Sequence, residues 1–306
     1  MKNDWIGAGQ GSLFIPRLSL FLIYISLFSL FSCAHPPPIP PPPPKPAKIA
    51  LVLGAGASKG FAHIGVLKIL EANRVPVHLI VGTSVGSFVG SLAAYGYSAY
   101  DLQKIAFSIE RGDIVGLAIP DNGFIRGDRL EEYVNRAVKN TPLEKLPIPF
   151  YAVATDIQDG REMVFGRGNT GAAVRASCSI PGIFQPARIG QRMYVDGGVV
   201  SPVPVEAARR YGGEVVIAVD ISATQENPKP ENFLETVLQA VNIMYLRLSA
   251  AQLAQADIVI RPKVGHIASA DFSRRHEAIL EGEKAALEAL PKLKELLARL
   301  KGEGRL

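Results

Sequence analysis

The sequence Gly82-Thr83-Ser84-Val85-Gly86 joins an apolar run at residues 77–81 to a helix-like run at residues 87–95. A G-x-S-x-G pattern between a strand and a helix is typical of a nucleophile elbow. A turn this tight needs room where a Cβ atom would clash, and the two glycines provide it. The serine then lies at a helix N-terminus, where N–H groups and the helix dipole favour negative charge. We predict that Ser84 is a nucleophile; the alternative is a helix-capping serine.

A serine nucleophile also needs hydrogen-bond donors for the oxyanion that forms on attack. The stretch Gly54-Ala55-Gly56-Ala57-Ser58-Lys59-Gly60 follows an apolar, strand-like run at residues 49–53 and precedes a helical pattern at residues 61–72. A dinucleotide-binding fingerprint fits poorly because Lys59 stands where the third glycine belongs, and no Gly-Lys-Ser/Thr follows for a P-loop. Small side chains let backbone N–H groups approach a substrate, and Lys59 adds positive charge nearby. This stretch is therefore predicted to form an oxyanion hole.

The proton acceptor is predicted at the end of another strand-like run. Residues 193–198 read Met-Tyr-Val-Asp-Gly-Gly, which places Asp196 before two glycines. A carboxylate there can accept a hydrogen bond from a serine directly, so no histidine is required. It needs a pKa raised by partial desolvation to act as a base near neutral pH. The alternative is a turn aspartate, and Asp156, after the run at residues 150–155, is a lesser candidate for the acid.

Together the three motifs resemble the patatin-like phospholipase family, over residues 48 to about 290. Residues 51–67 look like the opening signature of that family, the elbow follows at the family's spacing, and Asp196-Gly197-Gly198 is similar to its Asp-Gly-Gly/Ala motif. The resemblance implies a serine acyl hydrolase, of phospholipase or lysophospholipase type, with a Ser84–Asp196 dyad. It implies oxyanion donors at Ala55, Gly56, Ala57 and Val85, supported by Gly54, Lys59, Gly60, Gly82, Gly86, Gly197 and Gly198.

The alternation of strand-like and helical runs predicts an α/β fold, a three-layer α/β/α sandwich with a mainly parallel sheet, in one domain at residues 48–306. No metal motif or cofactor fingerprint is visible, so we expect no cofactor. With only Cys33 and Cys178, a disulfide framework or a cysteine-based zinc site is excluded. The net charge is +5, but the basic residues are scattered along the sequence. The sequence therefore shows no basic cluster of the kind that binds nucleic acid. The expected partner is a phospholipid or another acyl ester.

The first 47 residues are predicted to lie outside that domain. Residues 1–32 have the basic and apolar regions of a signal peptide, and Leu30-Phe31-Ser32-Cys33 resembles a bacterial lipoprotein cleavage box. The resemblance implies a lipidated Cys33 and a membrane-anchored protein of the cell envelope, in the outer membrane if the cell has two membranes. An uncleaved membrane anchor is the alternative. Residues 33–47 are mostly proline and predict an extended tether of roughly 30 Å.

Two other functional hypotheses remain open at this point. A Ser-His-Asp triad could use His266 or His276, which follow Asp196 in the chain order of α/β-hydrolases. The elbow, however, follows only the second predicted strand of the domain, which is early for that fold. A non-catalytic lipoprotein that binds lipid or protein is the second hypothesis, and the three intact motifs count against it.

Overall fold

The computed structural model describes residues 44–114, 125–222 and 229–306. The chain divides into two units, residues 1–43 and residues 44–306. The predicted signal peptide, Cys33 and most of the proline-rich tether lie outside the described residues and stay predictions. Within the described ranges, no helix combines the length and the hydropathy needed to cross a bilayer.

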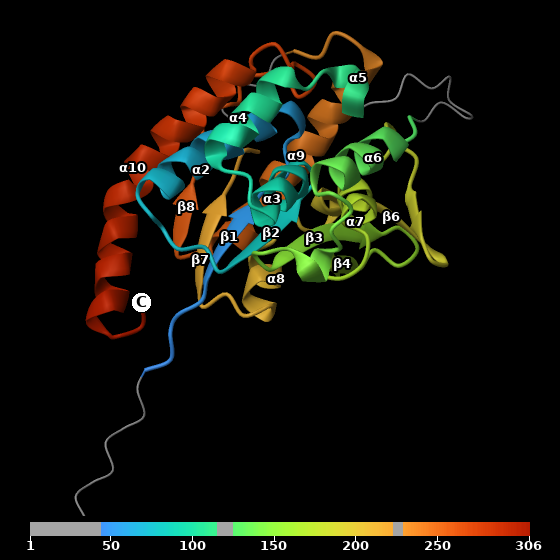
Figure 1. The fold of residues 1–306 in the computed structure, drawn as a ribbon. Coiled ribbons are helices and arrows are strands. Elements are labelled where there is room, and N and C mark those ends of the chain that lie inside the picture. Colours follow the sequence, from blue (N-terminus) through green and yellow to red (C-terminus); the bar gives the residue numbers. More distant parts are fainter. Residues whose placement is uncertain (1–43, 115–124, 223–228) are drawn as a thin grey trace, which may run out of the picture. The chain divides into compact units, whose positions relative to one another are not determined.

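One mixed sheet organises the second unit, and its described part has eight strands in the order β5-β6-β3-β2-β1-β7-β8, with β4 also paired to β3 (Figure 1). Pairing is parallel among β3, β2, β1, β7 and β8, and antiparallel for β4, β5 and β6. The strands are β1 (Ile49–Leu53), β2 (Leu79–Thr83), β3 (Phe150–Asp156), β4 (Glu162–Phe165), β5 (Ala187–Ile189), β6 (Arg192–Asp196), β7 (Val215–Val219) and β8 (Ile258–Ile260).

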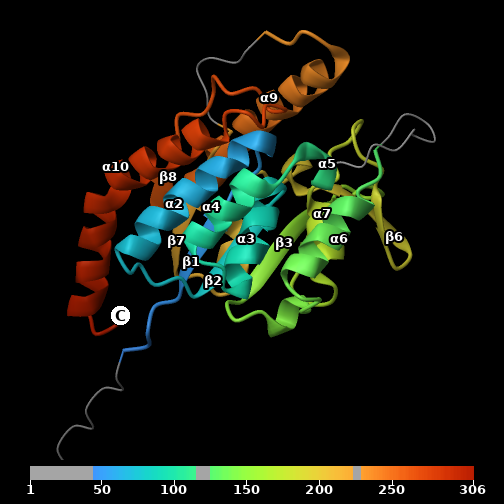
Figure 2. The ribbon, with the colours of Figure 1, turned by 45° about the horizontal axis from the view of Figure 1, so that its top comes forward.

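Helices cover both faces of the sheet, as Figures 1 and 2 show. The helices are α2 (Phe61–Ala72), α3 (Val85–Tyr95), α4 (Ala99–Ser108), α5 (Arg111–Ile114), α6 (Asp128–Ala137), α7 (Thr170–Ser177), α8 (Val205–Arg210), α9 (Phe233–Leu253) and α10 (Arg275–Gly302), with 3₁₀ turns η1 (Ala57–Gly60), η3 (Leu143–Lys145) and η4 (Gly197–Val199). These layers confirm the predicted α/β sandwich. β5 is a strand that the sequence pattern did not indicate.

The side chains of β1 show how the two layers form. Ile49, Leu51 and Leu53 belong to a core with apolar residues of α2, α3, α4, α6 and α10. Ala50 and Val52 point to the other face and pack with α8 and the end of α9. Successive strand side chains alternate between faces, so a strand buried on both sides is apolar throughout. This explains the unbroken apolar runs in the sequence.

The long strand β3 brings the ends of β2 and β6 together. β4 pairs with residues 152–155 of β3, overlapping the stretches that pair with β2 and with β6. A strand has only two edges, so β4 occupies one edge, and β2 and β6 share the other. Thr83 of β2 is in register with Val153, and Asp196 of β6 with the next residue, Ala154. The residue after β2, Ser84, therefore meets the last residue of β6.

Candidate active site

Ser84 occupies a strained turn between β2 and α3. Its φ of 56° and ψ of −127° lie outside the regions that L residues favour, at a cost of about 1–3 kcal/mol. A Cβ atom on Gly86 would come within 2.0 Å of the Leu53 carbonyl oxygen, and one on Gly82 within 2.4 Å of the Gly86 carbonyl oxygen. Gly86 thus lets the elbow pack directly on the end of β1, and Gly82 makes room for the turn itself.

Hydrogen bonds hold the backbone of Ser84 on both sides. Its N–H donates to Ser177 Oγ at 2.9 Å, and its carbonyl accepts from Ser87 Oγ at 2.7 Å. Ser177 in turn donates to the carbonyl of Val153 in β3, at 2.6 Å. Only 3% of Ser84 is exposed. The strained conformation is therefore fixed by its surroundings, and the Ser84 amide is already used.

Asp196 is fully buried beside Ser84. Its Oδ1 accepts the Gly198 amide at 2.8 Å, while Oδ2 has no partner among the described residues that meets hydrogen-bonding geometry. Burial raises the pKa of Asp196 to about 6, and the hydroxyl groups of Ser84 and Tyr245 oppose this rise as hydrogen-bond donors. Since Oδ2 has no well-aligned partner, these two contacts are looser than full hydrogen bonds. Oδ2 is the carboxylate atom available to take a proton.

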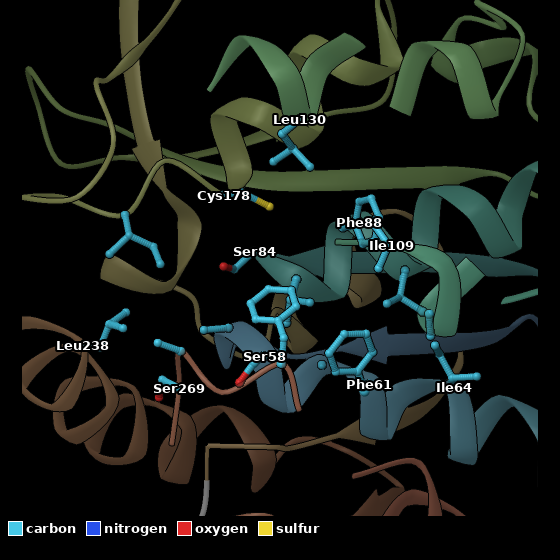
Figure 3. Close-up of a pocket in the computed structure, with 18 of the residues that line it drawn as sticks. Ser58, Phe61, Ile64, Ser84, Phe88, Ile109, Leu130, Cys178, Leu238 and Ser269 are labelled. Atoms are coloured by element: carbon cyan, nitrogen blue, oxygen red, sulfur yellow. The ribbon is translucent and has the colours of Figure 1, made fainter. Parts of the chain in front are cut away.

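Two side chains near the pair were not predicted from the sequence. Tyr245 of α9 is 3% exposed, its hydroxyl has no partner with good geometry in the described chain, and its pKa is raised well above the usual value by burial and by Asp196. A Cβ atom on Gly198 would lie 2.2 Å from the Tyr245 ring, so that glycine makes room for it. Cys178 is partly buried and lies next to Ser84 (Figure 3). No motif marks either residue.

The stretch from Gly54 to Gly60 packs against the elbow. A Cβ atom on Gly60 would lie 2.1 Å from a methyl group of Val85. His63 is buried and neutral, because burial lowers its pKa to about 4, and its Nε2–H donates to the Gly54 carbonyl at 2.8 Å. Ala57 has a φ of 50°, a left-handed conformation that costs an alanine roughly 1 kcal/mol. The stretch is thus held in one shape at some cost in strain.

The amides of this stretch divide into used and available donors. The Ala55 N–H donates to the Pro202 carbonyl at 2.9 Å, so the prediction that Ala55 supplies an oxyanion donor is wrong for this conformation. The amides of Gly56, Ala57 and Val85 donate to no acceptor in the described ranges. Ala57 and Val85 line the same pocket as Ser84. These three amides are the candidates for the oxyanion hole.

An apolar pocket with a cavity volume of about 170 Å³ opens beside Ser84 (Figure 3). Its walls come from α2, α3, α4 and the loops around residues 180 and 270, and include Phe61, Phe88, Leu102, Ile109, Ile183 and Phe272. None of the described residues that line this pocket is charged, and the carboxylate of Asp196 lies beside Ser84. Such a pocket suits a hydrocarbon chain whose polar end reaches the serine.

The histidines and the second aspartate are engaged elsewhere. His266 Nε2 lies 2.6 Å from Glu277 Oε1, and His276 stacks on Phe107. Asp156 pairs with Arg192 at 2.7 Å, which lowers its pKa. None of the three lines the pocket of Ser84. Across the ranges that the structure covers, no cluster of His, Cys, Asp or Glu could hold a metal ion.

The chain is similar in sequence to known proteins. The chain is 32% identical over 206 residues to an uncharacterized NTE family protein of Mycobacterium bovis, which covers 66% of this chain and 57% of that protein. It is 34% identical over 186 residues to the human patatin-like phospholipase domain-containing protein 6, covering 58% of this chain and 14% of that protein. The chain thus spans only part of each relative.

A solved structure has the same fold. The crystal structure of VipD from Legionella pneumophila superposes with a TM-score of 0.57 at 13% identity, covering 81% of this chain and 67% of that one. At sequence level, the model of the patatin-like phospholipase family matches residues 51–209, just over half of the chain. The match begins in β1 and ends in α8, so it contains the 54–60 stretch, Ser84 and Asp196. The chain therefore belongs to the patatin-like phospholipase family.

Proposed function

We propose that the chain is a serine acyl hydrolase that cleaves carboxylic esters of lipids with a Ser84–Asp196 dyad. The observation that supports this most strongly is that Ser84 and Asp196 lie together beside an apolar pocket, because Thr83 and Asp196 pair with successive residues of β3. Family membership supports the reaction class, and the apolar pocket supports an acyl chain as the bound group. His266 contacts Glu277 and His276 stacks on Phe107, which counts against a Ser-His-Asp triad.

In the proposed mechanism, Asp196 Oδ2 takes the proton of the Ser84 hydroxyl as Oγ attacks the ester carbonyl carbon. The carbonyl oxygen becomes an oxyanion, which the amides of Gly56, Ala57 and Val85 stabilise. The tetrahedral intermediate collapses, the alcohol leaves with the proton from Asp196, and an acyl-serine remains. Asp196 then takes a proton from water, which attacks the acyl-serine, and returns that proton to Ser84 Oγ as the fatty acid is released.

The test compares three variants with wild type on a soluble p-nitrophenyl ester and on a panel of phospholipids and lysophospholipids read by mass spectrometry. Ser84→Ala and Asp196→Asn are each expected to lower kcat by about 10³-fold or more without unfolding the protein. Asp156→Asn is the matched control, because Asp156 also ends a strand but pairs with Arg192; it should stay active. Wild-type rates in Asp196→Asn would refute the dyad. Absence of any ester cleavage by the folded wild type would support a binding protein.

We also propose that the domain works at a membrane to which a lipid on Cys33 attaches it. The cleavage-box pattern before Cys33 and the proline-rich segment after it support this. In a two-membrane bacterium, Ala34 after the cysteine favours the outer membrane. Metabolic labelling with an alkynyl fatty acid should mark the wild type and Cys178→Ala, but not Cys33→Ala. Equal labelling of Cys33→Ala would refute the anchor.

A further inference from the structure

Lys59 is a buried cation without a partner. Only 1% of the residue is exposed, yet its amine makes no hydrogen bond or ion pair with any residue in the described ranges. Desolvation lowers its pKa to about 8, and no neighbouring acid restores it. A buried charge that is not paired opposes folding, and a bound anion would offset this cost. Lys59 therefore marks a place where an anion would be stabilised.

Lys59 lines a pocket separate from the acyl pocket of Ser84. This second pocket also contains Lys229, Glu235 and Gln239. Two lysines and one glutamate are thus among its lining residues, and the carboxylate of Glu235 accepts the Glu231 amide at 2.8 Å. The cavity volume is about 20 Å³, enough for one oxygen atom of an anion, and the exposed Lys229 lies at the rim, where the rest of a larger group would remain.

The two pockets share a wall. Leu238 and Ser269 line both, and Figure 3 shows these two side chains on the same side of the Ser84 pocket. The loop that carries Ser269 is fixed on η1, because Ser58 donates from its amide to the Ser269 carbonyl at 3.1 Å and from Oγ to the Ala268 carbonyl at 2.9 Å. Lys59 and Ala57 belong to the same 3₁₀ turn, η1, so the stretch that carries candidate oxyanion donors also lines the second pocket.

We propose that this second pocket binds a phosphate-type anion through Lys59 and Lys229. On a lipid substrate, the anion is the phosphate of the headgroup, which lies one short glycerol linkage away from the ester at Ser84. This second statement rests on the proposed hydrolase function, whereas anion binding itself does not. The substrate class would then be phospholipids or lysophospholipids in preference to neutral acylglycerols.

The direct test measures binding of inorganic phosphate and of glycerol 3-phosphate by calorimetry, in the full chain carrying Ser84→Ala. Adding Lys59→Met is expected to weaken binding by about tenfold or more, since one charge-assisted hydrogen bond is lost. Adding Lys229→Met, at the exposed rim, should weaken it severalfold without affecting the fold. Lys104→Met, on the outer surface of α4, is the control and should bind as before. Equal binding with and without Lys59, or no binding at millimolar phosphate, would overturn the proposal.

A second measurement distinguishes the source of the anion. With Ser84 intact, Lys229→Met should raise KM for a lysophospholipid by several fold and leave KM for the matching monoacylglycerol unchanged. If phosphate binding depends on Lys59 but KM for both lipids is unchanged, the pocket binds free phosphate, and the headgroup assignment is wrong. The binding arm uses an inactive variant, so it remains informative even if the chain hydrolyses no lipid.

Discussion

Asp196 must be ionised to act as a base, but burying its charge costs free energy. Ionised, it can accept the proton of Ser84, but burial disfavours the ionised form. A base with a pKa near 6 is mostly ionised at neutral pH and is more basic than an exposed aspartate. The same burial that opposes ionisation therefore makes this carboxylate effective in the proposed reaction.

The pH dependence of kcat/KM should report this carboxylate. Activity on a soluble ester should fall as the pH drops below about 6, because protonated Asp196 accepts no proton. Tyr245→Phe removes a donor that lowers the pKa of Asp196, so the acidic limb of the profile should move to higher pH. Tyr211→Phe, on an exposed tyrosine, should leave the limb in place. An unchanged limb in Tyr245→Phe would show that Tyr245 does not tune the base.

The stability of Asp196→Asn should reveal the cost of the buried charge. Because the pKa rises from 3.8 to about 6, ionisation of Asp196 opposes folding by about 3 kcal/mol at pH 7. The asparagine variant should therefore be inactive but more stable than wild type by about 1–3 kcal/mol at pH 7, measured by urea unfolding. The wild type regains this stability as the pH falls through 6 towards 4, so the difference should disappear there. Equal stabilities at pH 7 would contradict the argument.

Strain at Ser84 gives a second stability prediction. Glycine adopts a φ of 56° without penalty, whereas alanine does not. Both Ser84→Gly and Ser84→Ala should be inactive, but the glycine variant should be more stable than the alanine variant by about 1 kcal/mol. Thermal unfolding of the two variants side by side tests this. The reverse order would mean that the elbow relaxes on losing the hydroxyl.

At the scale of elements, two glycines set how closely α10 packs against α2. A Cβ atom on Gly65 of α2 would lie 1.9 Å from the Ile279 carbonyl oxygen of α10, and one on Gly282 of α10 would lie 2.0 Å from the Ala62 carbonyl oxygen of α2. The two helix backbones are thus nearly in contact, and Figures 1 and 2 show them side by side. His63 lies in the same part of α2, so this contact also supports the stretch at residues 54–60.

Gly282→Ala should therefore push α10 away from α2. We expect a loss of about 2–4 kcal/mol in the free energy of unfolding, since the clash is with backbone that cannot move aside. Gly302→Ala, at the end of the same helix where nothing lies within 4 Å of the added atom, should be neutral or slightly stabilising. Chemical denaturation of both variants provides the comparison, and a neutral Gly282→Ala would contradict the proposed packing.

Sequence reasoning succeeded where the signal is local. The apolar runs ending at Leu53 and Val81 and the glycines of the elbow follow from side-chain burial and turn sterics, which neighbouring residues reveal. The pairing of β6 with the far end of β3 depends on contacts between residues about forty positions apart, which no local pattern encodes. For the same reason, the engagement of the Ala55 amide by Pro202 and the approach of Tyr245 to Asp196 could not be foreseen.

At the scale of the whole molecule, the second unit carries every group that the proposed reaction uses. The start of this unit is bonded to its C-terminal end. The Ala47 amide donates to the Arg305 carbonyl at 2.8 Å, and Arg305 pairs with Glu214 at 2.5 Å. A variant limited to residues 44–306 should therefore fold and cleave a soluble ester with kcat within about twofold of the full chain. Unfolding of this variant, or loss of its turnover, would show that residues 1–43 contribute to the domain.

The shared edge of β3 has a consequence for how this site can change. The spacing of the two reacting side chains is set by a ladder of main-chain hydrogen bonds, which does not depend on the identity of the surrounding side chains. Pocket walls can then be exchanged, and new substrates accommodated, while the nucleophile and its base keep their separation. An insertion or deletion of one residue in β6 is different, since it would turn the carboxylate to the opposite face of the sheet.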